Sequence, residues 1–201
     1  MSPSLLAQGV ALASAAGVST YATVALLGVA ARQGWIGELP AGLAALSSWW
    51  IIGLAAALYA VEFLATLIPG VASAWEAVHT FIRPVAGAGL AAATVYQGDG
   101  DGTMGLVAAL LGGTLALGTQ ATKLGARVTI DASPEPVTNG AANLAELGFV
   151  GAVGLLVWQH PWVALGIALG MLVLVAVLVR TVWTSIGRGV GRLFGRQTGA
   201  R

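Results

Sequence analysis

The chain has 201 residues, of which 57% are hydrophobic and only 8% are charged, and its mean hydropathy is +0.86. Because a soluble domain carries about 25% charged residues, this composition excludes an ordinary soluble domain and predicts an integral membrane protein with the lipid bilayer as its partner. The chain has no cysteine, which excludes disulfides and thiolate metal sites, and its net charge of +1 gives no reason to expect nucleic-acid binding.

Six stretches of the chain fit membrane-spanning helices, each of which needs about 20 residues to cross the hydrocarbon. They cover residues 5–31, 48–68, 74–96, 104–128, 140–158 and 162–183. The first contains Ala-Ser-Ala, as signal peptides do before their cleavage site. No basic residue precedes it, however, and the apolar run continues to Ala31, so we expect a retained helix.

The third stretch is the least regular, because its apolar part covers only residues 84–96. To cross a bilayer the helix must begin near Ala74 and include Glu76, His79 and Arg83. The alternative is a separate interfacial helix over residues 71–82. Glycine-rich and proline-containing segments at residues 97–102 and 131–138 predict the clearest turn and the longest polar loop.

The turn near residue 100 divides the chain into two sets of three spans, an arrangement typical of inverted-repeat transporters. Gly17 to Thr23 and Gly118 to Lys123 are similar Gly- and Thr-rich interruptions, although small residues that allow close helix packing explain them equally simply. We therefore predict an all-α polytopic membrane bundle of about six transmembrane helices, with two inverted three-helix halves as a finer hypothesis. Residues 1–184 form the single membrane domain, and a basic Gly/Arg-rich cytoplasmic tail covers residues 185–201.

The basic residues predict the orientation, because cytoplasmic segments of membrane proteins are enriched in Lys and Arg. If both termini are cytoplasmic, every basic residue except Arg32 lies at the inner side of the membrane. We therefore expect a multi-pass protein of the cytoplasmic (inner) membrane with both termini inside. Gly166 and Gly170 form a small-xxx-small pair that is typical of helix dimerisation, which makes a homodimer a further hypothesis.

Charged residues inside the predicted spans are the main functional signal, since an ionisable group at membrane depth is costly and normally faces a cavity or a partner charge. Glu76, His79 and Arg83 share one helix face, and two further polar stripes follow the same periodicity in the fourth and fifth spans. The predicted substrate or ion pathway contains Glu62, Glu76, His79, Arg83, Gln120, Lys123, Arg127, Asn143 and Glu146. A third polar position, Asn139, precedes Asn143 on the stripe of the fifth span. The acids and permanent bases balance three to three, as a site of low dielectric constant requires.

Two functional interpretations follow. The first is a small transporter or permeation protein with a cytoplasm-facing cavity, in which Lys123 and Arg127 hold an anionic group such as phosphate and Glu146 or Glu62 accepts a proton. The second is a non-transporting scaffold or assembly factor, in which the same charges form a dry network that fixes the packing of the helices.

An enzyme is less favoured, because the candidate nucleophiles Ser19, Thr20 and Tyr21 in the first span have no histidine near them in sequence. Glu76 and His79 have the spacing of helical carboxylate metal sites, but such sites need two of these motifs plus further carboxylates. We therefore expect no metal, cofactor or catalytic residue.

Four segments carry a family resemblance. They are Val61-Glu-Phe-Leu-Ala, Ile68-Pro-Gly-Val, Trp75-Glu-Ala-Val-His-Thr-Phe-Ile-Arg-Pro-Val-Ala-Gly and Thr119-Gln-Ala-Thr-Lys-Leu-Gly-Ala-Arg. With them the chain, from about Gly9 to beyond Leu155, resembles the bacterial membrane proteins of domain-of-unknown-function family 4126. The family pattern has an acidic residue where this chain has Thr66, which argues against a fourth carboxylate there. The resemblance implies the membrane architecture and no particular activity.

Overall fold

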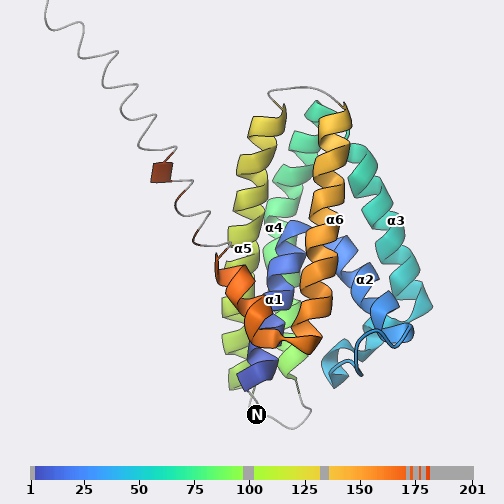
Figure 1. Ribbon diagram of the computed structural model, residues 1–201, viewed down its shortest axis with the longest axis vertical. Helices are drawn as coiled ribbons and strands as arrows, with labels where there is room; N and C mark the ends of the chain where they lie inside the picture. Colours follow the sequence, from blue (N-terminus) through green and yellow to red (C-terminus); the bar gives the residue numbers. More distant parts are fainter. Residues whose placement is uncertain are drawn as a thin grey trace, which may run out of the picture.

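The computed structural model describes residues 3–96, 102–131 and 136–170, together with residues 173, 177, 180 and 181. Within these residues all regular secondary structure is helical (Figure 1). The elements are α1 (Pro3–Val18), α2 (Thr20–Arg32), the 3-10 helix η1 (Ala41–Ser47), α3 (Trp49–Ala65), α4 (Pro69–Val95), α5 (Thr103–Asp131) and α6 (Pro136–Gln159). A short apolar helix, Pro161–Gly170, follows α6.

Two helices are long and apolar enough to span a membrane, over Thr103–Gly125 and Val137–Gln159. The bent pair η1 and α3 gives a third candidate, with an angle of 71° between the two helices. The chain is therefore an all-helical protein of membrane type with two or three candidate spans, and the number six stays a prediction. The tail at 185–201, most of the second half of the last predicted span, and residues 97–101 and 132–135 lie outside the described residues.

The first apolar stretch is a helical hairpin and not one span, so our prediction of a continuous helix over residues 5–31 was wrong. Ser19 has extended backbone angles (φ −150°, ψ 109°) that end α1, and its hydroxyl accepts a hydrogen bond from the Ala22 amide, which caps α2. Serine at the N-cap position stabilises the start of a new helix, and here it favours a break over one continuous helix. The hydropathy of the stretch does not distinguish these two outcomes.

The direction of α2 follows from what it touches. Leu12 and Leu27, which lie on either side of Ser19, pack in the same apolar cluster. The Arg32 guanidinium at the end of α2 lies 4.6 Å from the centre of the Trp49 ring, at the start of α3. Figure 1 shows α1 rising to the middle of the bundle and α2 returning to the end where the N-terminus lies. The hairpin thus enters and leaves the bundle at one end.

This reversal removes the basis of two predictions. The cytoplasmic N-terminus was inferred from the basic residues together with six crossings, the first of them over residues 5–31, but the N-terminus lies at the bundle end opposite the α3–α4 turn. The inverted halves required an odd number of crossings in the first half. Instead α1 and α5 run in the same direction. Gly112 lies against Ala13 and Ala116 lies against Gly17, so residue numbers increase the same way along both helices.

Helix α1 is the centre of the bundle, packed between α4, α5 and α6. Its buried residues are mostly the small residues alanine, glycine and serine, and a side chain on Gly17 would collide with the backbone of α5 at Ala116. Small residues let the backbones of packed helices approach closely. This packing places the tip of the hairpin deep inside the bundle, beside the middle of α5.

Helix α4 is continuous from Pro69 to Val95, which excludes the alternative of a separate interfacial helix over residues 71–82. Pro69 occupies the first turn, where a missing amide hydrogen costs nothing. The helix carries Glu76, His79 and Arg83 into the interior, as the sequence predicted. Helix α5 is likewise continuous past Gly118, so it has no counterpart to the break at Ser19.

The hairpin predicts which ends of the chain share a side of the membrane. Because native cysteine is absent, Pro3→Cys, Gly37→Cys and Gly70→Cys each give one exposed thiol. In oriented vesicles we expect a membrane-impermeant maleimide to label positions 3 and 37 from one side and position 70 from the other. Labelling of positions 3 and 37 from opposite sides would restore a single span over residues 5–31.

Candidate functional site

Six charged residues from four helices meet in one interior cluster, which we call the charge network. Its members are Glu62 of α3, Glu76 and Arg83 of α4, Lys123 and Arg127 of α5, and Glu146 of α6. Five of the six are buried, and only the Glu146 side chain, with 22% of its surface exposed, reaches the edge. The structure therefore brings together the three acids and the three permanent bases that the sequence predicted to balance one another.

Arg83 is the innermost cation and is fully buried. Its Nη2 donates to Glu62 Oε1 at 2.5 Å, and its Nη1 donates to Glu76 Oε2 at 2.6 Å. Gln120 completes this part of the site, since its Oε1 accepts from Arg83 Nη1 and its Nε2 donates to Glu76 Oε2 at 3.0 Å. The planar guanidinium suits this role because it presents donors in several fixed directions.

Lys123 joins the parts of the network. Its Nζ lies 3.3 Å from Glu62 Oε1, 3.1 Å from Glu76 Oε1 and 2.8 Å from Glu146 Oε2. It also donates to the Val18 carbonyl oxygen at 3.0 Å. A single ammonium thus contacts all three carboxylates and the last residue of α1.

The hairpin tip is bound to the network through both of its helix ends. The carbonyl end of α1 carries partial negative charge, and Lys123 contacts it at Val18. The amide end of α2 carries partial positive charge, and Glu62 accepts a hydrogen bond there from the Ser19 hydroxyl at 2.7 Å. Charges of the appropriate sign therefore stabilise the break in the helix.

At the outer edge, Arg127 Nη2 donates to Glu146 Oε1 at 2.9 Å and to Asn143 Oδ1. Asn143 Nδ2 in turn donates to the Thr66 hydroxyl at 2.9 Å and to the Phe63 carbonyl at 3.2 Å. The end of α3 is thereby fixed to α6. The Thr66 hydroxyl thus takes part in hydrogen bonding across this edge.

His79 lies beside the network and not within it. Its Nδ1 is 2.8 Å from the Trp75 carbonyl oxygen, which only accepts, so Nδ1 carries a hydrogen. In the neutral ring Nε2 then accepts from the Tyr21 hydroxyl at 3.1 Å. His79 therefore ties α4 to the start of α2. Within the described residues, no group of three or more His, Asp or Glu side chains could hold a metal ion.

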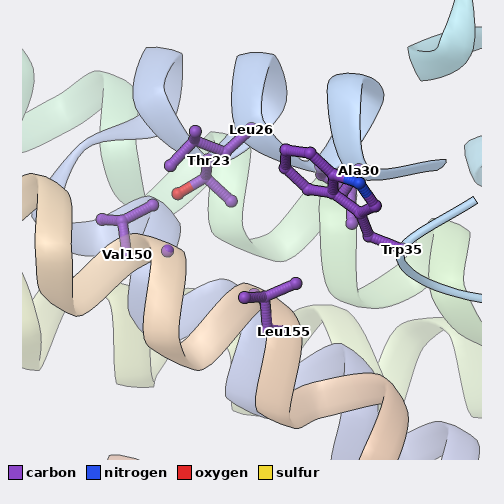
Figure 2. Close-up of a pocket in the computed structure, with 9 residues that line it drawn as sticks. Thr23, Leu26, Ala30, Trp35, Val150 and Leu155 are labelled. Carbon is purple, nitrogen blue, oxygen red and sulfur yellow. The ribbon is translucent and has the colours of Figure 1, made fainter. Parts of the chain in front are cut away.

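A separate apolar cavity lies between α2 and α6. Figure 2 shows Leu26, Ala30 and Trp35 on one side of it and Val150 and Leu155 on the other. Its volume is about 70 Å³, and no residue of the charge network lines it. The cavity borders the outer flank of the hairpin, where α2 packs against α6.

Sequence reasoning missed the groups that the hairpin tip contributes. The Val18 carbonyl is a backbone atom, and such a ligand leaves no sequence signature. Ser19 and Tyr21 lie in the Gly17 to Thr23 interruption, which was noticed but interpreted as part of a continuous span. A serine two residues after a glycine, inside an apolar stretch, was the available signal.

The fold and the charge network define a class of all-helical proteins with helices able to span a membrane and charged residues in the interior. The chain belongs to DUF4126, a family described as a domain of unknown function, whose match covers residues 6–181. This confirms the resemblance inferred from the four sequence segments. No curated protein and no solved structure matches the chain.

Removing one carboxylate from the network predicts a large loss of stability. Glu62→Gln leaves Arg83 and Lys123 with one compensating charge fewer, and an uncompensated buried charge costs about 3–5 kcal/mol. We expect a clear fall in the midpoint of thermal unfolding in detergent. Glu38→Gln, at an exposed position, is the matched control and should leave the midpoint unchanged. Equal midpoints for the two variants would contradict the network as described.

Proposed function

We propose that the protein is a small transporter or permeation protein, and that the charge network is its substrate or ion site in a closed state. The position of the hairpin tip carries this proposal. Discontinuous helices whose ends meet ions and substrates near the centre of the membrane are typical of secondary transporters. A broken backbone at membrane depth is tolerated where protein buries it or where it lines a cavity.

The composition of the network also supports a role beyond stability. Replacing a buried ion pair with apolar residues of similar size is often neutral or stabilising, so a bundle does not need six interior charges in order to fold. Gln120 and Asn143 add further polar groups. The proposed pathway comprises Glu62, Glu76, His79, Arg83, Gln120, Lys123, Arg127, Asn143 and Glu146.

Proton transfer offers a way to open this site. A proton on Glu62 would weaken its contacts to Arg83 and Lys123, and would compete with the Ser19 hydrogen bond that holds the tip. The Tyr21–His79 contact would then hold the tip to α4. Glu146 is the second candidate proton acceptor, because its side chain reaches the edge of the cluster.

The proposed orientation places the network end of the bundle, with the α3–α4 turn, towards the cytoplasm. Lys123 and Arg127 belong to the network, while Arg32 lies against Trp49 at the start of α3, away from the α3–α4 turn, which agrees with the positive-inside tendency. Helices α3 to α6 and the helix that begins at Pro161 would cross the inner membrane, and the hairpin would enter it without crossing. The N-terminus would then face away from the cytoplasm.

Burial of the network favours a second candidate, the non-transporting scaffold. Glu62, Glu76 and Arg83 are at most 3% exposed, and the three acids are matched by three bases. In a scaffold this arrangement would be permanent and would fix how the helices pack. The two candidates differ in whether the network ever admits water or a solute.

Replacing the outer ion pair distinguishes them. Arg127→Met combined with Glu146→Leu removes one positive and one negative charge, so Glu62, Glu76, Arg83 and Lys123 remain balanced. We expect this variant to fold with little change in its unfolding midpoint, because paired removal avoids an uncompensated charge. In proteoliposomes loaded with a pH-sensitive dye, we expect proton flux, measured with and without added phosphate, to fall at least about tenfold relative to the unmodified chain.

Arg32→Met combined with Glu38→Gln, at the far end of the bundle, is the matched control and should retain the flux. If the unmodified chain gives no flux with either solution, the transporter is contradicted and the scaffold favoured. Full flux in the Arg127→Met, Glu146→Leu variant would exclude the outer pair from the pathway.

A further inference from the structure

Arg127 and Asn139 have polar atoms that the fold leaves unused. Within the described part of the chain, Arg127 Nε and Nη1 and Asn139 Nδ2 and Oδ1 are buried and have no hydrogen-bond partner. Arg127 is 3% exposed and Asn139 is not exposed at all. Buried polar groups are nearly always hydrogen-bonded in native proteins. Unsatisfied donors and acceptors on two buried side chains therefore indicate that a ligand binds to them.

These atoms belong to one region between α5 and α6. Arg127 reaches α6 at Asn143 and Glu146 through its Nη2 atom alone, which leaves its other two nitrogens free. Asn139 lies one helical turn before Asn143 on the same face of α6. The region is thus the outward continuation of the charge network, between the contact that fixes Thr66 and the start of α6.

Electrostatics in this region favour an anion. Arg127 has two unused N–H donors beside its ion pair with Glu146, and Asn139 lies in the first turn of α6, a helix of 24 residues whose amide end carries partial positive charge. The six network residues are balanced among themselves, however, so each negative charge that a ligand adds is left uncompensated. A singly charged anion is therefore favoured over a doubly charged one.

The hydrogen-bonding pattern narrows the ligand further. Arg127 Nε and Nη1 and Asn139 Nδ2 are donors, whereas Asn139 Oδ1 is an acceptor and needs an O–H or N–H group opposite it. A singly charged phosphate group, which is a monoester with one proton or inorganic phosphate with two, offers both anionic oxygens and an O–H donor. Sulfate at neutral pH offers oxygens alone.

We propose that Arg127 and Asn139 form a binding site for a protonated phosphate group. The inference deepens the proposed function, on which it rests for the role of the site, by naming phosphate as the substrate class. The same chemistry is available from free inorganic phosphate and from the headgroup of a lipid phosphate monoester. Because the site lies towards the end of the bundle, either source would reach it without crossing the apolar middle.

The test uses the full chain, purified in detergent, and isothermal titration with inorganic phosphate. We expect phosphate to bind and to raise the unfolding midpoint, and sulfate at equal ionic strength to do neither. Binding should be tighter at about pH 6 than at about pH 8, because more of the phosphate is then singly charged and protonated.

Asn139→Leu separates a binding role from a structural one. If Asn139 serves only to bind phosphate, the variant should weaken phosphate binding at least about tenfold while its unliganded midpoint stays equal or rises, since an unsatisfied buried amide has been removed. Arg32→Met is the control for loss of an arginine and should bind phosphate normally. Unchanged phosphate affinity in Asn139→Leu, or a lower unliganded midpoint, would overturn the inference.

A second arm identifies the source of the phosphate. In nanodiscs we compare phosphatidic acid with phosphatidylcholine. If the ligand is a lipid headgroup, phosphatidic acid should raise the unfolding midpoint of the unmodified chain and not that of Asn139→Leu. If the ligand is free phosphate, phosphatidic acid should leave the unfolding midpoint unchanged. Binding of neither inorganic phosphate nor phosphatidic acid would refute the site. Phosphate binding without any flux would contradict the transporter and support the phosphate site. Flux without phosphate binding would support the transporter and contradict the phosphate site.

Discussion

The contacts of the Lys123 ammonium hold the interior of this protein together. One cation lies within 3.3 Å of a carboxylate on each of α3, α4 and α6, and it also binds the carbonyl oxygen that ends α1. A buried cation of this kind is stable only while its partners are charged and in place. The packing of four helices and the position of the hairpin therefore depend on the same few atoms, and the protonation state of one carboxylate affects all of them.

In the proposed transporter, this dependence gives the network a physical route to opening. Burial makes each contact strong and makes each lost contact costly, so the loss of one contact affects the others. The tip of the hairpin is the element most directly affected when these contacts change, because charged side chains bind Val18 and Ser19. The apolar cavity beside α2 leaves space on the opposite flank of the same element.

Much of the site was predictable from the sequence, and the path of the chain through the bundle was less so. Helical periodicity placed Glu76 and Arg83 on one face, and the cost of an isolated charge in an apolar interior implied that they would find partners. The reversal at Ser19 was not predictable, because an apolar stretch has the same hydropathy whether it crosses a membrane or folds back inside it. His79 shares the helical face of Glu76, yet Tyr21, a residue of the unpredicted hairpin, hydrogen-bonds to it.

Water access to the buried network is the most direct test of this account. Thr119 is fully buried beside Gln120 and Lys123, and Thr119→Cys introduces one thiol without altering any charge. We predict that a membrane-impermeant maleimide will modify this thiol slowly in intact membranes, from the side that holds the α3–α4 turn, because the proposed transporter opens the network towards that side. Modification only after denaturation would contradict the account and leave a permanently dry network.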